Sequence, residues 1–147
     1  MEDVLVVPVC IVDFGVRSLI LTTTVDSTKS STFKDIQGGF QVAYGDNTGA
    51  TGDFISDYFG IGGVTIKDLT MGLVNQTTTG SGLMGIGYDI NEHVVTSGAS
   101  TTPYKSIMDT MLDQGLINTK SYSLYLDDQT ASSGSVIFGG ADTGKFM

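Results

Sequence analysis

The sequence predicts an all-β fold with one or two short helices. Glycine is abundant, with 20 residues among 147, whereas proline occurs only twice. Short segments rich in β-branched and aromatic residues alternate with Gly, Asn, Asp and Ser, a pattern typical of strands separated by turns. Only one segment carries apolar residues at helical spacing. Together these observations favour a sheet-based domain in which helices play a minor part.

Length and charge limit what this domain can do. A chain of 147 residues suits one domain with a sizeable core. Seven basic and 16 acidic residues give a net charge of −9, and so acidic a surface repels phosphate backbones and anionic lipids. We therefore expect no nucleic-acid partner and no membrane partner. The longest apolar run, Val4–Val12, is too short to span a bilayer, and acidic Glu2 and Asp3 argue against a signal peptide.

Two residue types with versatile chemistry occur once each. Cys10 is the only cysteine, so no disulfide can form within the chain. His93 is the only histidine, so a zinc site built from several His and Cys ligands is excluded. We expect neither a metal nor a cofactor.

The first strands can be predicted in order along the chain. Val4–Val12 has the composition of a buried strand, and the polar segment Thr22–Ser31 is predicted to be a loop. Phe40–Tyr44 alternates as a strand and leads into a turn signal at Gly45–Asn47. Gly52–Gly60 again has the pattern of a strand.

A second turn is predicted at Gly62–Gly63, because two glycines allow the positive φ angles that a tight hairpin requires. Val64–Lys67 alternates out of this turn as a strand. Near the C-terminus, Tyr122–Leu126 and Ser135–Phe138 are predicted as strands joined by the polar loop Asp127–Gly134.

One helix is predicted between these two groups of strands. Thr102 is the candidate N-cap, and Pro103 suits the first helical position. Gly115 is the expected terminator. The apolar residues that recur along one face of this helix are Tyr104, Ile107, Met108, Met111 and Leu112.

Several motifs with functional meaning elsewhere are better explained by structure here. Gly80–Gly85 matches G-x-G-x-x-G, but no helix start follows, so a tightly packed β segment is favoured over a nucleotide site. His93 lies in a polar stretch, and no serine has the surroundings of a nucleophile elbow, so a surface position is predicted. The acidic residues that lack calcium-loop spacing are predicted to be solvated charges in loops and at strand edges: Asp53, Asp57, Asp127 and Asp128.

Asn75-Gln76-Thr77 is a consensus sequence for N-linked glycosylation. Such a sequence has meaning only if the chain enters the secretory pathway. The Thr-rich segment around it is predicted to be a surface turn, so we expect Asn75 to be an accessible glycosylation site.

Four segments, in matching order and spacing, resemble motifs of the pepsin-like aspartic peptidases. Val25–Phe33 resembles the family's F-D-P-S-x-S-S-T-F stretch, and Val42–Asp46 with Thr51–Gly52 resembles its flap hairpin. Gly82–Tyr88 resembles D-G-I-L-G-L-A-Y. Asp113–Gly140 resembles the succession D-Q-G-L, F-S-x-Y-L and G-x-x-x-F-G-G. Within the family, the sequence is most similar to the yeast secreted and yapsin-like branch.

The resemblance implies a single pepsin-like lobe and an aspartic-type endopeptidase function. In this family two β-rich lobes each supply one aspartate, and a peptide or protein substrate lies between them. Two carboxylates so close cannot both ionise, so they share a proton. The ionised one activates a water molecule, and the protonated one donates to the peptide carbonyl.

The resemblance also implies how the chain is organised. Residues 25–147 resemble a partial N-terminal lobe, whereas residues 1–24 are atypical of the family and could reflect an incorrect gene prediction. The missing C-terminal lobe is then the necessary partner, and the chain alone is expected to be inactive. Secretion or a cell-surface location is implied in the same way.

By resemblance, Tyr44, Gly45 and Asp46 are the flap residues that contact substrate. The ring of Tyr44 would then cover the bound peptide and help to exclude water. The simpler alternative is a strand tyrosine that is half-buried at a turn and uses its hydroxyl for a local contact.

Asp13 is the candidate catalytic residue, because Ile11–Leu19 keeps the apolar lead, the aspartate, the glycine and a leucine of the family's D-T-G-[ST] loop. Phe14 and Val16 replace two hydroxyl residues that normally support this loop. Asp13 is therefore either a degraded catalytic position or a chance match. Asp142–Gly144 spells D-T-G, but it follows the glycine pair that ends the family's first lobe, so we interpret it as non-catalytic.

Two other functions remain open. One is a catalytically dead lobe that binds peptides or proteins in its half-cleft, which an intact Tyr44 flap beside a degraded Asp13 loop would favour. The other is a secreted acidic β-domain for adhesion, without peptidase ancestry. The ordered run of family-like segments argues against this last alternative.

Overall fold

A computed structural model of the chain describes residues 5–7, 26–78, 82–89, 103–126 and 134–144. The chain divides into two compact units, Met1–Thr110 and Met111–Met147. Strands dominate the regular structure of the described residues, so the all-β prediction is confirmed.

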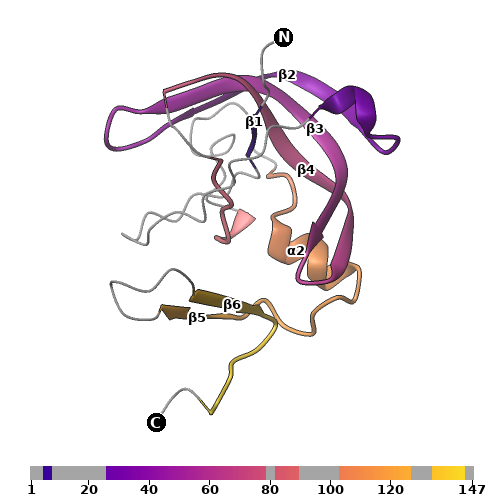
Figure 1. The fold of residues 1–147 in the computed structure, drawn as a ribbon, viewed down its shortest axis with the longest axis vertical. Coiled ribbons are helices and arrows are strands. Elements are labelled where there is room, and N and C mark those ends of the chain that lie inside the picture. Colours follow the sequence, from indigo (N-terminus) through magenta and orange to yellow (C-terminus); the bar gives the residue numbers. More distant parts are fainter. Residues whose placement is uncertain (1–4, 8–25, 79–81, 90–102, 127–133, 145–147) are drawn as a thin grey trace. The chain divides into compact units, whose positions relative to one another are not determined.

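The first unit contains a four-stranded sheet with the order β1-β4-β3-β2 (Figure 1). β2 (Lys34–Ala43), β3 (Gly49–Ile61) and β4 (Val64–Thr77) form an antiparallel meander in which each strand pairs with its neighbour in sequence. β1 (Leu5–Val7) pairs antiparallel with β4. The predicted strands of the meander are therefore confirmed, although each is longer than its sequence pattern indicated.

The N-terminal predictions are only partly covered by the described residues. Within the predicted strand Val4–Val12, Leu5–Val7 is a strand, and residues 8–12 lie outside the described part of the chain. The predicted loop Thr22–Ser31 contains a short 3-10 helix, η1 (Ser27–Lys29). Residues 22–25 of that loop also lie outside the described part.

The Gly62–Gly63 turn has the geometry expected from its sequence. Both glycines have positive φ angles, of 58° and 83°, and the flanking pair Ile61 and Val64 closes the hairpin. These φ angles are accessible to glycine at little cost, so the sequence fixes the turn between β3 and β4 at this point.

One buried cluster of the sheet is centred on Phe40. Its ring meets the ring of Phe54 edge-on, with the two ring centroids 5.3 Å apart. A side-chain carbon at Gly72 would come within 2.7 Å of the Phe40 ring, so the glycine makes room for it. The buried members of this cluster are Phe40, Val42, Ala50 and Val74. Alternation along β2 directs Phe40 and Val42 to one face, where Ala50 of β3 and Val74 of β4 join them.

Helix α2 (Ile107–Asp113) begins later than the sequence analysis predicted. Residues 103–106 are not helical, and Thr102 lies outside the described residues. The observed N-cap is Ser106, whose hydroxyl accepts from the Asp109 N–H at 3.2 Å and donates to the Asp109 carboxylate at 2.6 Å. The Ser106 hydroxyl thus gives one of the free N–H groups at the start of the helix an acceptor.

The end of α2 agrees with the prediction. Gly115 has a φ of 68°, and its N–H donates to the Leu112 carbonyl. The Leu116 N–H donates to the Met111 carbonyl, which completes the hydrogen-bond pair of a Schellman motif.

The second unit contains a two-stranded antiparallel sheet. β5 (Tyr122–Leu126) and β6 (Gly134–Phe138) pair from Tyr122 opposite Phe138 to Leu126 opposite Gly134, as the sequence predicted. Gly139, with a φ of 77°, donates its N–H to the Ser121 carbonyl immediately beyond this sheet.

In the part of the chain that the structure describes, no helix has both the length and the apolar composition needed to cross a membrane.

Candidate active-site hairpin and its buried anchor

The loop between β2 and β3 holds the three predicted flap residues. The Tyr44 N–H donates to the Thr48 carbonyl at 2.8 Å, and the Asn47 N–H donates to the Tyr44 carbonyl at 3.1 Å. Asn47 has a φ of 65°, in the left-handed region that Asn tolerates better than most residues. This combination is typical of a three-residue hairpin loop made of a turn followed by one left-handed residue.

Asp46 fixes the shape of this loop through local contacts. Its carboxylate accepts from the Thr48 N–H at 2.9 Å and from the Thr48 hydroxyl at 2.6 Å. These bonds to the side chain and the backbone of Thr48 hold the pKa of Asp46 below its ordinary value. Asp46 is exposed, so the loop presents a carboxylate that is ionised at neutral pH and faces water.

Tyr44 lies at the junction between the loop and the core. It is partly buried and packs against the cluster of Phe40, Val42, Ala50 and Val74. Burial and the neighbouring negative charge of Asp46 raise the pKa of its hydroxyl. Tyr44 therefore keeps its proton, and its phenol offers both a hydrogen-bond donor and an apolar ring at the loop.

Two glycines, one in this loop and one directly after it, differ in the space that a side chain would have. A side-chain carbon at Gly49 would lie 2.6 Å from the backbone carbonyl oxygen of Val42 in the facing strand, so a glycine is needed there. At Gly45 nothing lies within 4 Å of such a carbon. The backbone is thus closely packed at Gly49, where β3 begins, whereas the loop has open space around it at Gly45.

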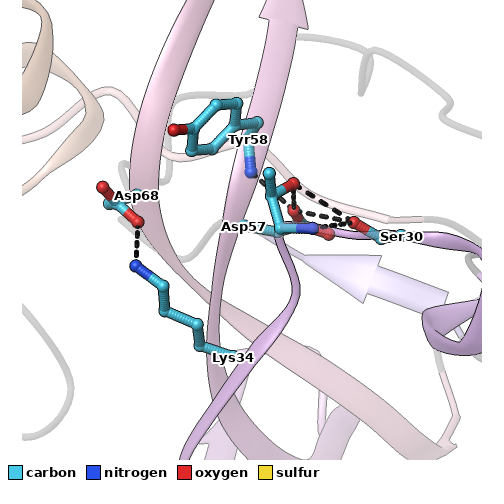
Figure 2. Close-up of polar contacts among 6 residues, drawn as sticks. Ser30, Lys34, Asp57, Tyr58 and Asp68 are labelled. Carbon is cyan, nitrogen blue, oxygen red and sulfur yellow. Dashed lines mark hydrogen bonds and ion pairs between the residues drawn. The ribbon is translucent and has the colours of Figure 1, made fainter.

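The segment before β2 is shaped by the F-D-P-S-like motif. Asp26 is the N-cap of η1, and its carboxylate accepts from the N–H and the hydroxyl of Thr28. Ser30 and Thr32 then reach β3, where their hydroxyls donate to one oxygen, Oδ1, of Asp57, at 2.9 and 2.5 Å (Figure 2). The hydroxyl residues of the motif therefore attach this segment to the sheet.

Asp57 is a buried anchor, which corrects the prediction that it is a solvated strand-edge charge. It is 7% exposed, and its Oδ1 also accepts from the Tyr58 N–H at 2.7 Å. Burial by itself raises the pKa of Asp57, but the bonds from Thr32, Ser30 and Tyr58 outweigh this effect and hold the pKa below its ordinary value. Asp57 is therefore an ionised carboxylate that receives three donors within the fold.

The position of Asp57 along β3 is consistent with this burial. Asp57 follows Ile55 by two residues in β3, and residues at that spacing face the same side of a strand. Ile55 is 1% exposed, so its face belongs to the interior. A carboxylate on that face needs donors, and the hydroxyls of Ser30 and Thr32 are the groups that supply them.

The other predicted site residues have different positions. Asp13 and His93 lie outside the described residues. Asp53 is partly buried, whereas Asp127 and Asp128 are also outside the described part. In the D-T-G at Asp142–Gly144, the carboxylate of the exposed Asp142 accepts from the Gly144 N–H at 3.0 Å.

Asn75 is in a strand rather than in the predicted turn. It lies within β4 and is exposed. Among the described residues, no group of three His, Cys, Asp or Glu side chains is arranged to hold a metal ion.

Comparison with known proteins decides the family. The sequence matches the family described as eukaryotic aspartyl protease over residues 16–147. The chain belongs to the eukaryotic aspartyl protease family. The matched range starts after Asp13, and it includes the β2–β3 hairpin, Asp57 and Asp142. This membership removes the alternative of an adhesion domain without peptidase ancestry.

Similar members of the aspartyl protease family come from fungi. The probable aspartic-type endopeptidase opsB of Aspergillus fumigatus is 39% identical over 127 residues, which are 86% of this chain and 26% of that protein. The acid protease of Saccharomycopsis fibuligera is 42% identical over 123 residues, covering 84% of this chain and 31% of that protein. Secreted aspartic protease 4 of Candida albicans is 39% identical over 117 residues, covering 80% and 27%. The chain spans about a quarter to a third of the length of these relatives.

A solved aspartyl protease structure has the same fold. The crystal structure of an aspartic proteinase from Irpex lacteus superposes with a TM-score of 0.67 and 23% sequence identity. The superposition covers 80% of this chain and 36% of that protein. The expectation of a pepsin-like fold is therefore confirmed.

Proposed function

We propose that this chain is one lobe of a fungal-type aspartic endopeptidase. The whole enzyme would hydrolyse peptide bonds in acid, using a water molecule activated between two aspartates, one from each lobe. The observation that carries this proposal is the family match over residues 16–147. The names of its relatives, an aspartic-type endopeptidase and an acid protease, support the same activity.

In this proposal residues 25–147 form a partial N-terminal lobe, and residues 1–24 are an atypical segment. The necessary partners are a C-terminal lobe and a peptide or protein substrate. The share of its relatives that the chain covers, near a quarter, supports the one-lobe assignment. A single lobe supplies at most one of the two aspartates, so the chain alone would be inactive.

The residues proposed to contact substrate are Tyr44, Gly45 and Asp46. Support comes from their place in the tip of the β2–β3 hairpin, which Asp46 holds in a defined shape. Gly45 has open space around it, which would let a substrate backbone approach closely. Asp13 remains the proposed catalytic aspartate on its sequence pattern, although the family match begins after it.

A catalytically dead lobe that binds peptides is the second candidate function. It is favoured by an intact hairpin combined with Phe14 and Val16, neither of which carries a hydroxyl to support the Asp13 carboxylate. Without such hydrogen bonds, the pKa of a catalytic aspartate would rise, and its ionised form would be lost.

Secretion is proposed as the location for either function. It is supported by the name of one relative, secreted aspartic protease 4 of Candida albicans.

The test joins the full 147-residue chain to the C-terminal lobe of the Saccharomycopsis fibuligera acid protease. Cleavage of denatured haemoglobin is measured in acid, with and without a statine-type inhibitor, and the chain alone is the matched control. We expect neither the control nor the unchanged fusion to cleave at a rate near that of the relative. Misplacing a catalytic group by about 1 Å can cost on the order of a hundredfold in rate.

Two substitutions then separate the candidate functions. Phe14→Thr together with Val16→Ser should restore cleavage that the inhibitor blocks and that Asp13→Asn abolishes. Activity that survives Asp13→Asn but not Asp142→Asn would move the catalytic assignment to Asp142. A repaired fusion that is folded by circular dichroism and binds the statine peptide, yet never cleaves, would favour the peptide-binding lobe instead.

A further inference from the structure

A β-bulge in β4 gives the glycosylation consensus an unusual position. Thr51 of β3 pairs with Gln76, but the next residue, Gly52, pairs with Val74. Asn75 is therefore the extra residue of the bulge, opposite no single partner in β3. The side chain of Asn75 is exposed, so the bulge presents an amide to solvent near the end of a long strand.

Gly52 is the residue that permits this geometry. A side-chain carbon there would lie 2.0 Å from the Leu73 carbonyl oxygen and 2.9 Å from the Val74 Cα. The backbone of β4 therefore comes so close to Gly52 at the bulge that only a glycine fits there. The bulge sets Asn75 apart from Val74, which is buried in the core.

The third residue of the consensus belongs to the base of the hairpin. The Thr77 hydroxyl donates to the Gly49 carbonyl at 3.2 Å, and the Thr78 N–H donates to the same carbonyl at 3.0 Å. The segment after Asn75 is therefore fixed to β3, while Asn75 itself faces solvent. A large substituent at Asn75 would displace none of these contacts.

We infer that Asn75 carries an N-linked glycan when the chain passes through the secretory pathway. The donor class is a lipid-linked oligosaccharide diphosphate. The Asn75 side-chain nitrogen forms a bond to the anomeric carbon of the sugar as the bond from that carbon to the diphosphate oxygen breaks. The lipid diphosphate leaves with the electron pair, and the nitrogen gives up one proton to a base.

Transfer takes place on the translocating chain, so what the folded protein must supply is room for the product. The exposed bulge supplies this room, because the glycan is attached at a position that is not part of the buried Phe40 cluster. Asn75-Gln76-Thr77 is also the only N-x-[ST] consensus in the 147 residues, so any N-linked glycan can be assigned without ambiguity. The inference rests on the proposed secretion but not on peptidase activity.

The experiment expresses the full chain behind a yeast signal peptide, with a C-terminal tag that carries a second consensus as a reporter of translocation. We expect two glycans, both removed by an endoglycosidase. Asn75→Gln and Thr77→Ala should each remove one glycan, whereas Thr77→Ser should keep both. Asn118→Gln is the matched control, because Asn118 is exposed but not part of a consensus, and it should also keep both.

A glycan on the reporter with an unmodified Asn75 in the same molecules would overturn the inference. This outcome would leave the peptidase proposal untouched, because translocation would have been demonstrated separately. Removal of the glycan from the native protein adds a structural readout. The endoglycosidase should act without denaturant if the bulge presents Asn75 to solvent, and a requirement for denaturant would contradict the proposed placement.

Discussion

Asp57 and Asp46 are two carboxylates with similar contacts in very different surroundings. Each accepts hydrogen bonds from a threonine hydroxyl and from a backbone N–H. The donors to Asp46 both belong to Thr48, two residues away, and this loop is exposed. The hydroxyl donors to Asp57 come from a segment 25 and 27 residues earlier in the chain, and the carboxylate is buried. When a hydrogen bond is removed, water can take its place at Asp46 but not at Asp57. A carboxylate should therefore contribute far more to stability at the buried position.

The largest effect is expected for Asp57→Ala. This change leaves the hydroxyls of Ser30 and Thr32 and the Tyr58 N–H without their acceptor in a buried site. We expect the free energy of unfolding to fall by about 2–3 kcal/mol, measured by urea denaturation. Asp57→Asn keeps an acceptor oxygen and should cost less. Equal losses for the two variants would show that the hydrogen bonds to Oδ1 are not what stabilises the fold.

Acidification should reveal the charge of Asp57. Its folded pKa lies below the ordinary value of 3.8, so its stabilisation is complete above that value and is lost as pH falls through the lower folded pKa. The difference in unfolding free energy between the wild type and Asp57→Asn should therefore shrink as pH drops below 3.8. Urea midpoints compared across this range test it. A difference that stays constant with pH would mean that the two states of the chain hold the Asp57 proton equally well.

Removing one hydroxyl in each place sharpens the comparison. Thr32→Val deletes one of three donors to the buried Asp57 carboxylate and should lower the free energy of unfolding by about 1 kcal/mol. Thr48→Val removes an equivalent bond in the exposed loop and should have a smaller effect. Thermal denaturation of the two variants in parallel gives the contrast, and a larger loss for Thr48→Val would reverse our interpretation.

A small change in stability is also expected for Asp46→Ala. Asp46 is exposed, and water can take over its contacts with Thr48, so the unfolding midpoint should move less than it does in Thr32→Val. The effect should appear instead as faster amide hydrogen exchange at Thr48, whose N–H loses its acceptor. Unchanged exchange at Thr48 would show that the loop keeps its shape without Asp46.

The elements that the sequence predicted well are those set by nearby residues. The Gly62–Gly63 turn, the loop after Tyr44 and the end of α2 at Gly115 all depend on φ angles that glycine or asparagine supplies locally. The predicted start of α2 is wrong. Pro103 suggests a first helical residue, but the helix begins one turn later, where Ser106 caps it through its bonds with Asp109.

Features set by distant residues were predicted less well. The burial of Asp57 depends on Ser30 and Thr32, and no local pattern states that a polar segment will fold back onto β3. The bulge at Asn75 depends on Gly52 in the neighbouring strand, so the consensus was assigned to a turn. For the candidate site, the hairpin that carries Tyr44 followed from its turn residues, whereas Asp13 stays a prediction from its sequence pattern.

The topology of the four-stranded sheet has a consequence for how the chain folds. β2, β3 and β4 are joined by short loops, so their contacts have low sequence separation and can form early, one hairpin after another. β1 is different, because pairing Val7 with Gly72 closes a loop of about 65 residues. Within the described residues, three residue pairs join β1 to β4, and these must offset the entropy lost in closing this loop. The N-terminal strand should therefore join a sheet that already exists, and it should be the first strand to leave when the protein begins to unfold.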